Sequence, residues 1–214
     1  MTDGTQVLYI GADNYPFPIP LEKYSDSGWY FDTSAGADEI LARRIGRNEL
    51  LAIDACSAIA NAQDVYFRGA HDGDSAHEYA PRNISTPGKQ DGLYWAVSGI
   101  QPASPLASLE KIAKDVVSSP KPGVAPVIDG YEFRILTSQG DDASGGSMSY
   151  MVDGKLTRGF AVIAFPVKYG DSGVMTFLVS DEGVVYQKDL GDNTAKVAPS
   201  ITSYDTGDGW TRAD

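Results

Sequence analysis

The sequence predicts an α+β protein in which a long N-terminal helix packs on an antiparallel β-meander. Between residues 130 and 190, runs rich in β-branched and aromatic residues alternate with Asp-Gly and Asp-Glu-Gly turns, a pattern typical of consecutive strands. Between Asp32 and Gly69, apolar residues recur instead at three- and four-residue steps, which is the spacing of one helix face. The length of 214 residues is enough for one full core or two small ones.

Residues 1–32 are expected to be edge strands and the remnant of a longer N-terminal segment. Residues 7–10 and 29–31 have the composition of strands. Between them, residues 15–20 carry three prolines, which allow only an extended edge or a polyproline-like path. We therefore expect these strands to need a neighbouring surface on which to pack.

The helical period begins after Asp32 and ends before Gly69. Thr33 or Ser34 is the predicted N-cap. Gly46 weakens the middle by roughly 1 kcal/mol relative to alanine, which leaves open a kinked helix or two consecutive helices. The only cysteine, Cys56, lies within the apolar stripe and has no partner for an internal disulfide, so we expect a small buried side chain. The stripe consists of Ile45, Ala52, Ile53, Cys56, Ile59, Ala60 and Phe67.

The main domain is predicted to span residues 33–192, followed by a polar tail at 193–214. Residues 69–104 form a long loop region rich in Gly, Asp, Pro and Ser. A second, short helix is expected over residues 105–118, because Ser104 can cap it and Pro105 suits its first position.

The predicted meander follows at residues 131–137, 157–167, 174–180 and 184–188. Asp153-Gly154 suits a two-residue hairpin turn. The string Asp181-Glu182-Gly183 suits a three-residue turn with glycine in the left-handed conformation.

Charge excludes several classes of partner. The formal net charge of −12 repels a phosphate backbone and an anionic membrane surface, and no local cluster of Lys and Arg offsets it. No stretch approaches the roughly 18–20 apolar residues of a transmembrane helix, and the first residues do not form a signal peptide. We expect a protein that is either cytosolic or has lost its export signal.

Four strings of the sequence carry a resemblance to a known family. Through these four strings the chain resembles an exported bacterial family that is catalogued as a domain of unknown function, number 2950. The resemblance covers nearly the whole chain. The resemblance implies a periplasmic or extracellular protein whose signal and N-terminal segment have been removed from this chain, and it implies no activity. The strings are residues 15–20, 29–33 with 39–50, 85–95 and 169–177.

A weaker similarity concerns layout alone. The order of a long helix, an acidic loop and a meander over residues 45–188 resembles the globular heads of type IV pilins and pseudopilins. Arg43, Arg44, Arg47 and Asn48 stand where a pilin has its apolar assembly segment. We therefore do not expect filament assembly by the pilin route, whereas a surface or scaffold role stays open.

The acidic string from His71 to Glu78 is the candidate metal site. Asp72, Asp74 and Glu78 supply the hard oxygen ligands that calcium binds at about 2.3–2.6 Å. Ala76 stands where an EF-hand loop needs Asp or Asn, so this is not an EF-hand. The alternative is an ordinary solvated acidic surface, and a transition-metal site using His71 and His77 is a weaker alternative still.

Two short motifs are set aside as catalytic signals. The string Gly170-Asp171-Ser172-Gly173 is similar to a serine-protease nucleophile loop, but Val174-Met175 follow it in place of Gly-Pro, and a tight turn between two strands explains its glycines more simply. Residues 108–111 have the Ser-x-x-Lys spacing without its partner motifs. The aromatic residues Tyr15, Phe17, Tyr94 and Trp95 would suit sugar or peptide binding, or packing over a sheet edge.

These observations favour a non-enzymatic, exported module of the cell envelope. We expect a structural role, a scaffold role or a role in protein interaction, with calcium as a candidate stabilising ion. Other envelope proteins are the candidate partners, and the oligomeric state stays open. The alternative is an envelope hydrolase with its site in the 69–104 loop region. A hydrolase should have a deep pocket in which His71 or His77 meets a carboxylate.

Overall fold

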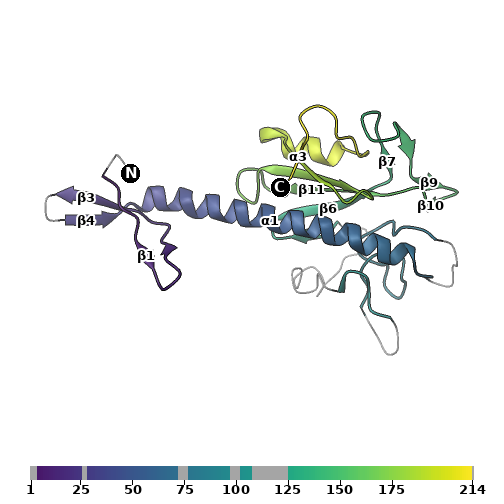
Figure 1. Ribbon diagram of the computed structural model, residues 1–214, viewed down its shortest axis with the longest axis horizontal. Coiled ribbons are helices and arrows are strands. Elements are labelled where there is room, and N and C mark those ends of the chain that lie inside the picture. Colours follow the sequence, from purple (N-terminus) through teal and green to yellow (C-terminus); the bar gives the residue numbers. More distant parts are fainter. Residues whose placement is uncertain (1–3, 26–27, 72–76, 97–101, 108–124, 214) are drawn as a thin grey trace. The chain divides into compact units, whose positions relative to one another are not determined.

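The computed structural model describes residues 4–25, 28–71, 77–96, 102–107 and 125–213 (Figure 1). The chain divides into two compact units, Met1–Arg47 and Asn48–Asp214, which we call the N-terminal and C-terminal units. The boundary falls within the long helix α1 (Thr33–Phe67). The predicted α+β class is confirmed, because this helix is combined with antiparallel sheets.

The N-terminal unit contains two antiparallel strand pairs. Strand β1 (Tyr9–Ile10) pairs with β2 (Tyr15–Pro16), and β3 (Leu21–Ser25) pairs with β4 (Gly28–Phe31). The main chains of Gln6 and Leu21 exchange hydrogen bonds of 2.9 and 2.8 Å, so the segment before β1 continues the pairing along β3. Short strands are present as expected, but the expectation that they add edges to the sheet of residues 130–190 was wrong, because the described strands of this segment pair only with one another.

Helix α1 begins with a cap that differs from the prediction. The Asp32 Oδ1 atom accepts hydrogen bonds from the main-chain N–H groups of Ser34 and Ala35, both at 3.0 Å. The predicted cap at Thr33 or Ser34 was therefore wrong by one or two residues, because the aspartate carboxylate reaches two of the otherwise unpaired N–H groups. The helix continues through Gly46 as one element, so two consecutive helices are not formed.

The C-terminal unit is built on a six-stranded antiparallel sheet. The strand order is β14-β13-β12-β11-β6-β5, and each neighbour pair is antiparallel. The predicted meander strands are confirmed with shifts of a few residues at their ends. The strands are β5 (Val127–Ile128), β6 (Tyr131–Leu136), β11 (Ala161–Pro166), β12 (Met175–Ser180), β13 (Val185–Asp189) and β14 (Thr211–Arg212).

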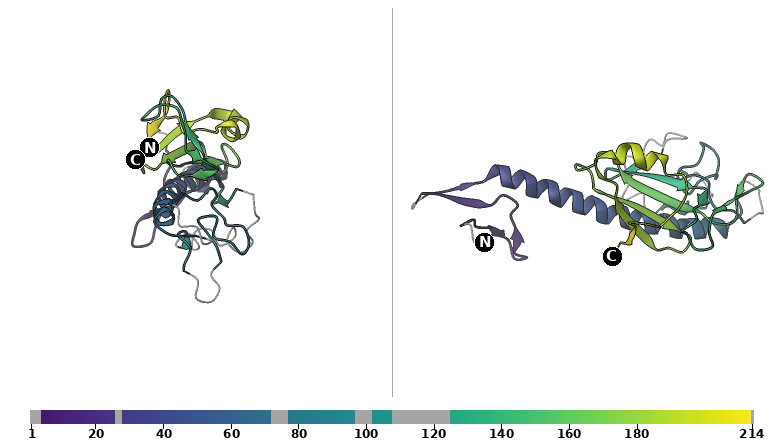
Figure 2. Two further views of the ribbon diagram at one scale, coloured as in Figure 1. Left: turned by 90° about the vertical axis from the view of Figure 1, so that its right-hand side faces the viewer. Right: turned by 90° about the horizontal axis from the view of Figure 1, so that it is seen from above.

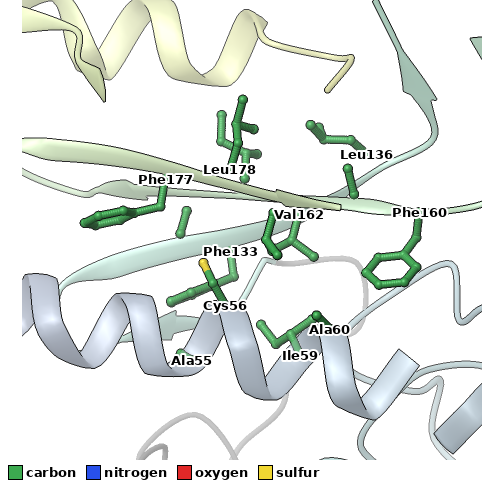
Figure 3. Close-up of a cluster of buried hydrophobic side chains, with 14 of the residues drawn as sticks. Ala55, Cys56, Ile59, Ala60, Phe133, Leu136, Phe160, Val162, Phe177 and Leu178 are labelled. Carbon is green, nitrogen blue, oxygen red and sulfur yellow. The ribbon is translucent and has the colours of Figure 1, made fainter. Parts of the chain in front are cut away.

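Both faces of the central strands are covered, which is why every residue of β11 is buried. Figure 3 shows Cys56 and Ile59 of α1 facing Phe133, Val162 and Phe177 on one face of the sheet. The side chains of Leu136 and Leu178 point to the opposite face (Figure 3). On that face lies the short helix α3 (Thr194–Val197), as the views in Figure 2 show. The core is therefore a helix, a sheet and a short helical segment in three layers.

The segment after β13 adds further short elements. It forms the 3-10 turns η2 (Gly191–Asn193) and η3 (Ala198–Ser200) on either side of α3, and then β14. Thr194 and Ala198 are fully buried, so this segment contributes to the core. The short helix predicted at 105–118 lies largely outside the described residues.

The turns of the meander have the predicted chemistry. Strands β9 (Met151–Val152) and β10 (Lys155–Leu156) are joined by Asp153 and Gly154, with φ of 48° and 80°. Both values lie in the left-handed region that a two-residue hairpin turn of type I′ requires. Gly183, in the turn between β12 and β13, has φ of 74°. A further antiparallel pair of short strands, β7 (Ser138–Gln139) and β8 (Met148–Ser149), precedes the β9–β10 hairpin in the chain.

Candidate functional site

The predicted calcium ligands are only partly described. Asp72 and Asp74 lie outside the described residues. The carboxylate of Glu78 lies 3.8 Å from the ammonium group of Lys155, which places it in a surface ion pair. Within the described ranges no three His, Cys, Asp or Glu side chains are grouped closely enough to hold a metal ion. The calcium site therefore stays a prediction.

His71 and His77 both contact the C-terminal end of α1. The Nε2 atom of His71 donates to the carbonyl oxygen of Tyr66 at 2.8 Å, and the Nδ1 atom of His77 donates to that of Phe67 at 2.9 Å. The His71 ring also stacks on the Tyr66 ring, with centroids 3.8 Å apart. The Tyr66 carbonyl also accepts the Gly69 N–H at 3.0 Å, so the two imidazoles add to the hydrogen bonds at the helix end.

Among the described residues, the hydrogen bonds of the two histidines go to main-chain carbonyls and not to a carboxylate. A general base must hold its ring nitrogen against the reacting proton and is usually oriented by a carboxylate. Here the hydrogen bonds to Tyr66 and Phe67 occupy one nitrogen of each ring. These hydrogen bonds hold both rings at the end of α1.

The Gly170-Asp171-Ser172-Gly173 string forms a tight turn. The hydroxyl group of Ser172 accepts a hydrogen bond from the Lys168 N–H group and donates one to the Lys168 carbonyl, both at 3.1 Å. Gly170 has φ of 72°, and Gly173 lies directly against the Tyr131 ring. The structure thus supports the interpretation of this string as a tight turn between two strands. The Ser-x-x-Lys spacing at 108–111 lies outside the described residues.

The aromatic residues predicted to bind or to pack fall into two groups. Tyr94 and Trp95 are only 8% and 7% exposed, and the Trp95 indole N–H donates to the carbonyl of Pro102 at 3.1 Å. These two side chains pack in the core. Tyr15 is instead 53% exposed, and Phe17 lies edge-on to Phe31 with ring centroids 5.7 Å apart.

The N-terminal unit exposes an unusual number of large apolar side chains. Among its described residues nine are at least 40% exposed, whereas the described residues of the C-terminal unit include four at that level, none of which is aromatic. We call these nine side chains the aromatic patch. They are Leu8, Tyr9, Ile10, Tyr15, Tyr24, Trp29, Tyr30, Phe31 and Ile40.

A cleft of about 700 Å³ lies within the same unit. Its apolar lining comes from the proline-rich segment Pro16 to Pro20 and from Val7 and Tyr9. Its charged lining comes from the β3 strand and from the first turns of α1. The charged residues are Glu22, Asp32, Glu39 and Arg43.

Arg43 organises one wall of this cleft. Its Nε atom donates to the Glu39 carboxylate at 2.7 Å, and its Nη1 atom donates to the Pro16 carbonyl at 2.7 Å and to the Tyr15 hydroxyl at 3.1 Å. The guanidinium carbon lies 5.4 Å from the centre of the Tyr15 ring, within cation–π range. The hydrogen bond from Arg43 to Glu39 raises the pKa of the guanidinium further above its ordinary range.

A second polar contact fixes the β3–β4 hairpin at the cleft. The Tyr30 hydroxyl donates to the Glu22 carboxylate from the opposite strand, where the two residues are paired in register. This hydrogen bond raises the pKa of Tyr30, because the negative charge of Glu22 favours the protonated phenol. Glu22 is also one of the residues that line the cleft.

Sequence reasoning selected Tyr15 and Phe17 but missed the carboxylates beside them. A sequence signal for them was available, since Glu22, Asp32 and Glu39 all follow the three prolines within the next twenty residues or so. It was hidden because such residues are equally common on plain surfaces and at helix starts. Only the fold brings strand β3, the start of α1 and the proline-rich segment around one cleft.

The fold and this cleft define a two-unit α+β protein with an exposed, aromatic N-terminal unit. The family model for DUF2950, described as a protein of unknown function, matches residues 1–213, and the chain belongs to this family. No curated protein and no solved structure matches the chain, so the similarity to pilin heads depends on sequence layout alone. In the described part of the chain, no helix combines the length and the hydropathy of a membrane span.

Proposed function

We propose that this protein is a non-enzymatic, exported module of the bacterial cell envelope that binds partner proteins through its N-terminal unit. The observation that carries the proposal is the aromatic patch. Exposed large apolar side chains that gather in one small unit are a feature of interaction sites. Tyr24 is 83% exposed and Tyr9 is 61% exposed, so these rings are far from buried within the chain itself.

The residues of the patch are also the types that interfaces favour. Tyr, Trp and Phe supply large contact areas and are enriched at interaction hot spots. The core of the protein begins only at Ala52, and no residue of the N-terminal unit belongs to it among the described residues. The described aromatic residues of this unit therefore do not belong to that core.

The chemistry of the remaining candidates supports a binding role over hydrolysis. Cys56 is fully buried, the Ser172 hydroxyl is used in a turn, and both imidazoles are bonded to main-chain carbonyls. None of these described groups has the nucleophile and base arrangement of a covalent or hydrolytic mechanism.

Site-specific photo-cross-linking in cells tests the proposal. A photoreactive amino acid placed at Tyr24 or Trp29 is expected to give adducts of defined mass with other envelope proteins. The matched positions Leu50 and Val65 are exposed and apolar but lie in the C-terminal unit, and they are expected to give none. Equal adducts at all four positions, or none at Tyr24 and Trp29, would contradict the proposal.

Stabilisation by calcium is part of the same proposal and depends on Asp72, Asp74 and Glu78. If these carboxylates bind calcium, the ion should raise the melting temperature, and Asp74→Ala should abolish that rise. An identical melting temperature of the parent protein with calcium and with a chelator would end this part of the proposal.

A further inference from the structure

The cleft of the N-terminal unit has the composition of a site for a cationic, extended chain. Its lining includes the aromatic residues Tyr9 and Phe17 and the acidic residues Glu22, Asp32 and Glu39. Aromatic faces attract cations through their quadrupoles, and nearby carboxylates add a direct charge attraction. A volume of about 700 Å³ lies within the range of established ligand sites and exceeds the needs of one side chain.

The charges that line the cleft have a clear sign. The lining includes three acidic residues and one basic residue, so it carries a net charge of −2 (three negative, one positive). The single positive group, Arg43, is already matched by Glu39 at 2.7 Å. What the lining lacks is positive charge, so charge complementarity favours an occupant with Lys or Arg side chains.

The molecule already contains one example of this recognition. Arg43 lies over the Tyr15 ring while it donates to a carboxylate and to a main-chain carbonyl. These are the three kinds of contact that a cationic side chain from outside would find along the same walls.

The same charges argue against the other occupants. The chain carries a net charge of −12, so a second copy would bring further negative charge to a negative cleft. A nucleic acid or an anionic lipid surface would be repelled for the same reason. A basic segment of a partner protein is the occupant whose charge fits.

We propose that this cleft binds a basic, extended segment of a partner protein, with a lysine or arginine side chain between the Tyr9 and Phe17 rings and the carboxylates. This inference deepens the proposed function and rests on it, since it names the chemistry of the segment that the N-terminal unit recognises. The apolar side chains of the segment would contact the proline-rich wall, and its cationic groups would lie near Glu22 and Asp32.

Fluorescence anisotropy with the full chain and three labelled octapeptides tests the inference. The probes alternate leucine with lysine, glutamine or glutamate and are otherwise identical. The lysine peptide is expected to bind at least tenfold more tightly than the other two, and its binding is expected to weaken as salt is raised. Equal binding of the lysine and glutamine peptides, or no binding of the lysine peptide, would overturn the inference.

Two variants locate the binding on the cleft. Glu22→Gln and Tyr9→Leu are each expected to weaken the lysine peptide by threefold or more. The control Glu182→Gln removes the same charge from an exposed turn of the C-terminal unit and is expected to leave binding unchanged. Equal weakening by Glu182→Gln would show non-specific attraction to an acidic protein and would overturn the inference.

The oligomeric state tests whether a second copy of this chain, and not a basic segment of a partner, occupies the cleft. Sedimentation equilibrium is expected to show that the parent chain and Tyr9→Leu have the same mass. A parent dimer that Tyr9→Leu dissociates would assign the cleft to a second copy and overturn the inference. Envelope adducts at Tyr24 together with no lysine-peptide binding would reject this inference while leaving the proposed function supported, so the two failures are distinguishable.

Discussion

Gln63 and Ala80 exchange two hydrogen bonds as if they were paired residues of an antiparallel sheet. The Gln63 Nε2 atom donates to the Ala80 carbonyl at 2.9 Å, and the Ala80 N–H group donates to Gln63 Oε1 at 2.8 Å. Both residues are fully buried. A side-chain amide on α1 thus replaces a strand and satisfies the main chain of the loop that follows the helix.

Replacing this glutamine should therefore cost more than a surface substitution. In Gln63→Leu the Ala80 N–H and C=O groups would be buried without partners, and each such group costs about 1–3 kcal/mol. We expect the free energy of unfolding to fall by about 3 kcal/mol in urea denaturation. Asn61→Leu, an exposed position on the same helix, is the matched control and should change it by less than about 0.5 kcal/mol.

The parts of the fold that the sequence predicts well are those with a local signal. The turns at Asp153-Gly154 and Asp181-Glu182-Gly183 depend on neighbouring residues, and their left-handed glycines follow directly from the chain. The burial of Cys56 follows from its place in a helical stripe. These features need no knowledge of distant residues.

The features that the sequence did not predict depend on pairs far apart in the chain. Gln63 and Ala80 are 17 residues apart, and Glu49 accepts hydrogen bonds from the Val174 and Met175 N–H groups across more than 120 residues. A polar residue on a helix looks the same in sequence whether it faces solvent or binds a buried main chain. The exposure of Trp29 was hidden in the same way, since a strand-forming aromatic residue is equally suited to a core.

The thiol of Cys56 should be unreactive in the native protein. Its side chain is fully buried, and burial raises the pKa of the thiol to about 12. Thiol reagents attack the thiolate, which is scarce at pH 8 when the pKa is this high. We expect labelling at pH 8 to be at least a hundredfold slower in buffer than in 8 M urea, followed by mass spectrometry.

A cysteine on the exposed side of the same helix gives the control for this measurement. Asn61→Cys in a Cys56→Ala background should react at the rate of a free thiol peptide, because position 61 faces solvent. Rapid labelling of native Cys56 would contradict the packing of α1 on the sheet in Figure 3.

Asp91 should make the loop after α1 sensitive to acid. Its carboxylate accepts hydrogen bonds from the Thr86 N–H group at 2.7 Å and from the Thr86 hydroxyl at 2.8 Å. Burial alone would raise the pKa of Asp91, but these two hydrogen bonds and the charges of Arg82 and Lys89 outweigh burial, so the pKa is lowered. The ionised form is thus bound more tightly in the folded protein than in the unfolded chain.

The sign of the pH effect follows from that lowering. An unfolded aspartate titrates near pH 3.9, so the stabilisation is fully present above about pH 5 and is lost as the pH falls through the lower, folded pKa. We expect Asp91→Asn to lower the free energy of unfolding by about 1 kcal/mol at pH 7. The difference from the parent should shrink steadily below about pH 4 in urea denaturation. A difference that is constant from pH 7 to pH 3 would refute the role of the charge.

Two glycines in the turn formed by residues 170–173 should resist substitution for different reasons. At one the cause is the backbone conformation, and at the other it is the lack of room for a side chain. Gly170 has φ of 72° with open space around it, so Gly170→Ala should cost about 1 kcal/mol through the left-handed conformation alone. At Gly173 an added Cβ atom would lie 2.0 Å from the Tyr131 hydroxyl oxygen, in a ring that is itself buried. Gly173→Ala should therefore displace Tyr131 and cost about 1–3 kcal/mol, the range for overpacking a core.

Asparagine distinguishes the two causes, because it tolerates the left-handed region but occupies more space than alanine. Gly170→Asn should recover most of the stability that Gly170→Ala loses, whereas Gly173→Asn should be at least as damaging as Gly173→Ala. Thermal unfolding of the four variants measures both comparisons. If Gly173→Asn were as stable as the parent, Tyr131 would not lie against this turn, and the hydrogen bond of 2.9 Å from its hydroxyl to the Met175 carbonyl would not fix the strand that follows.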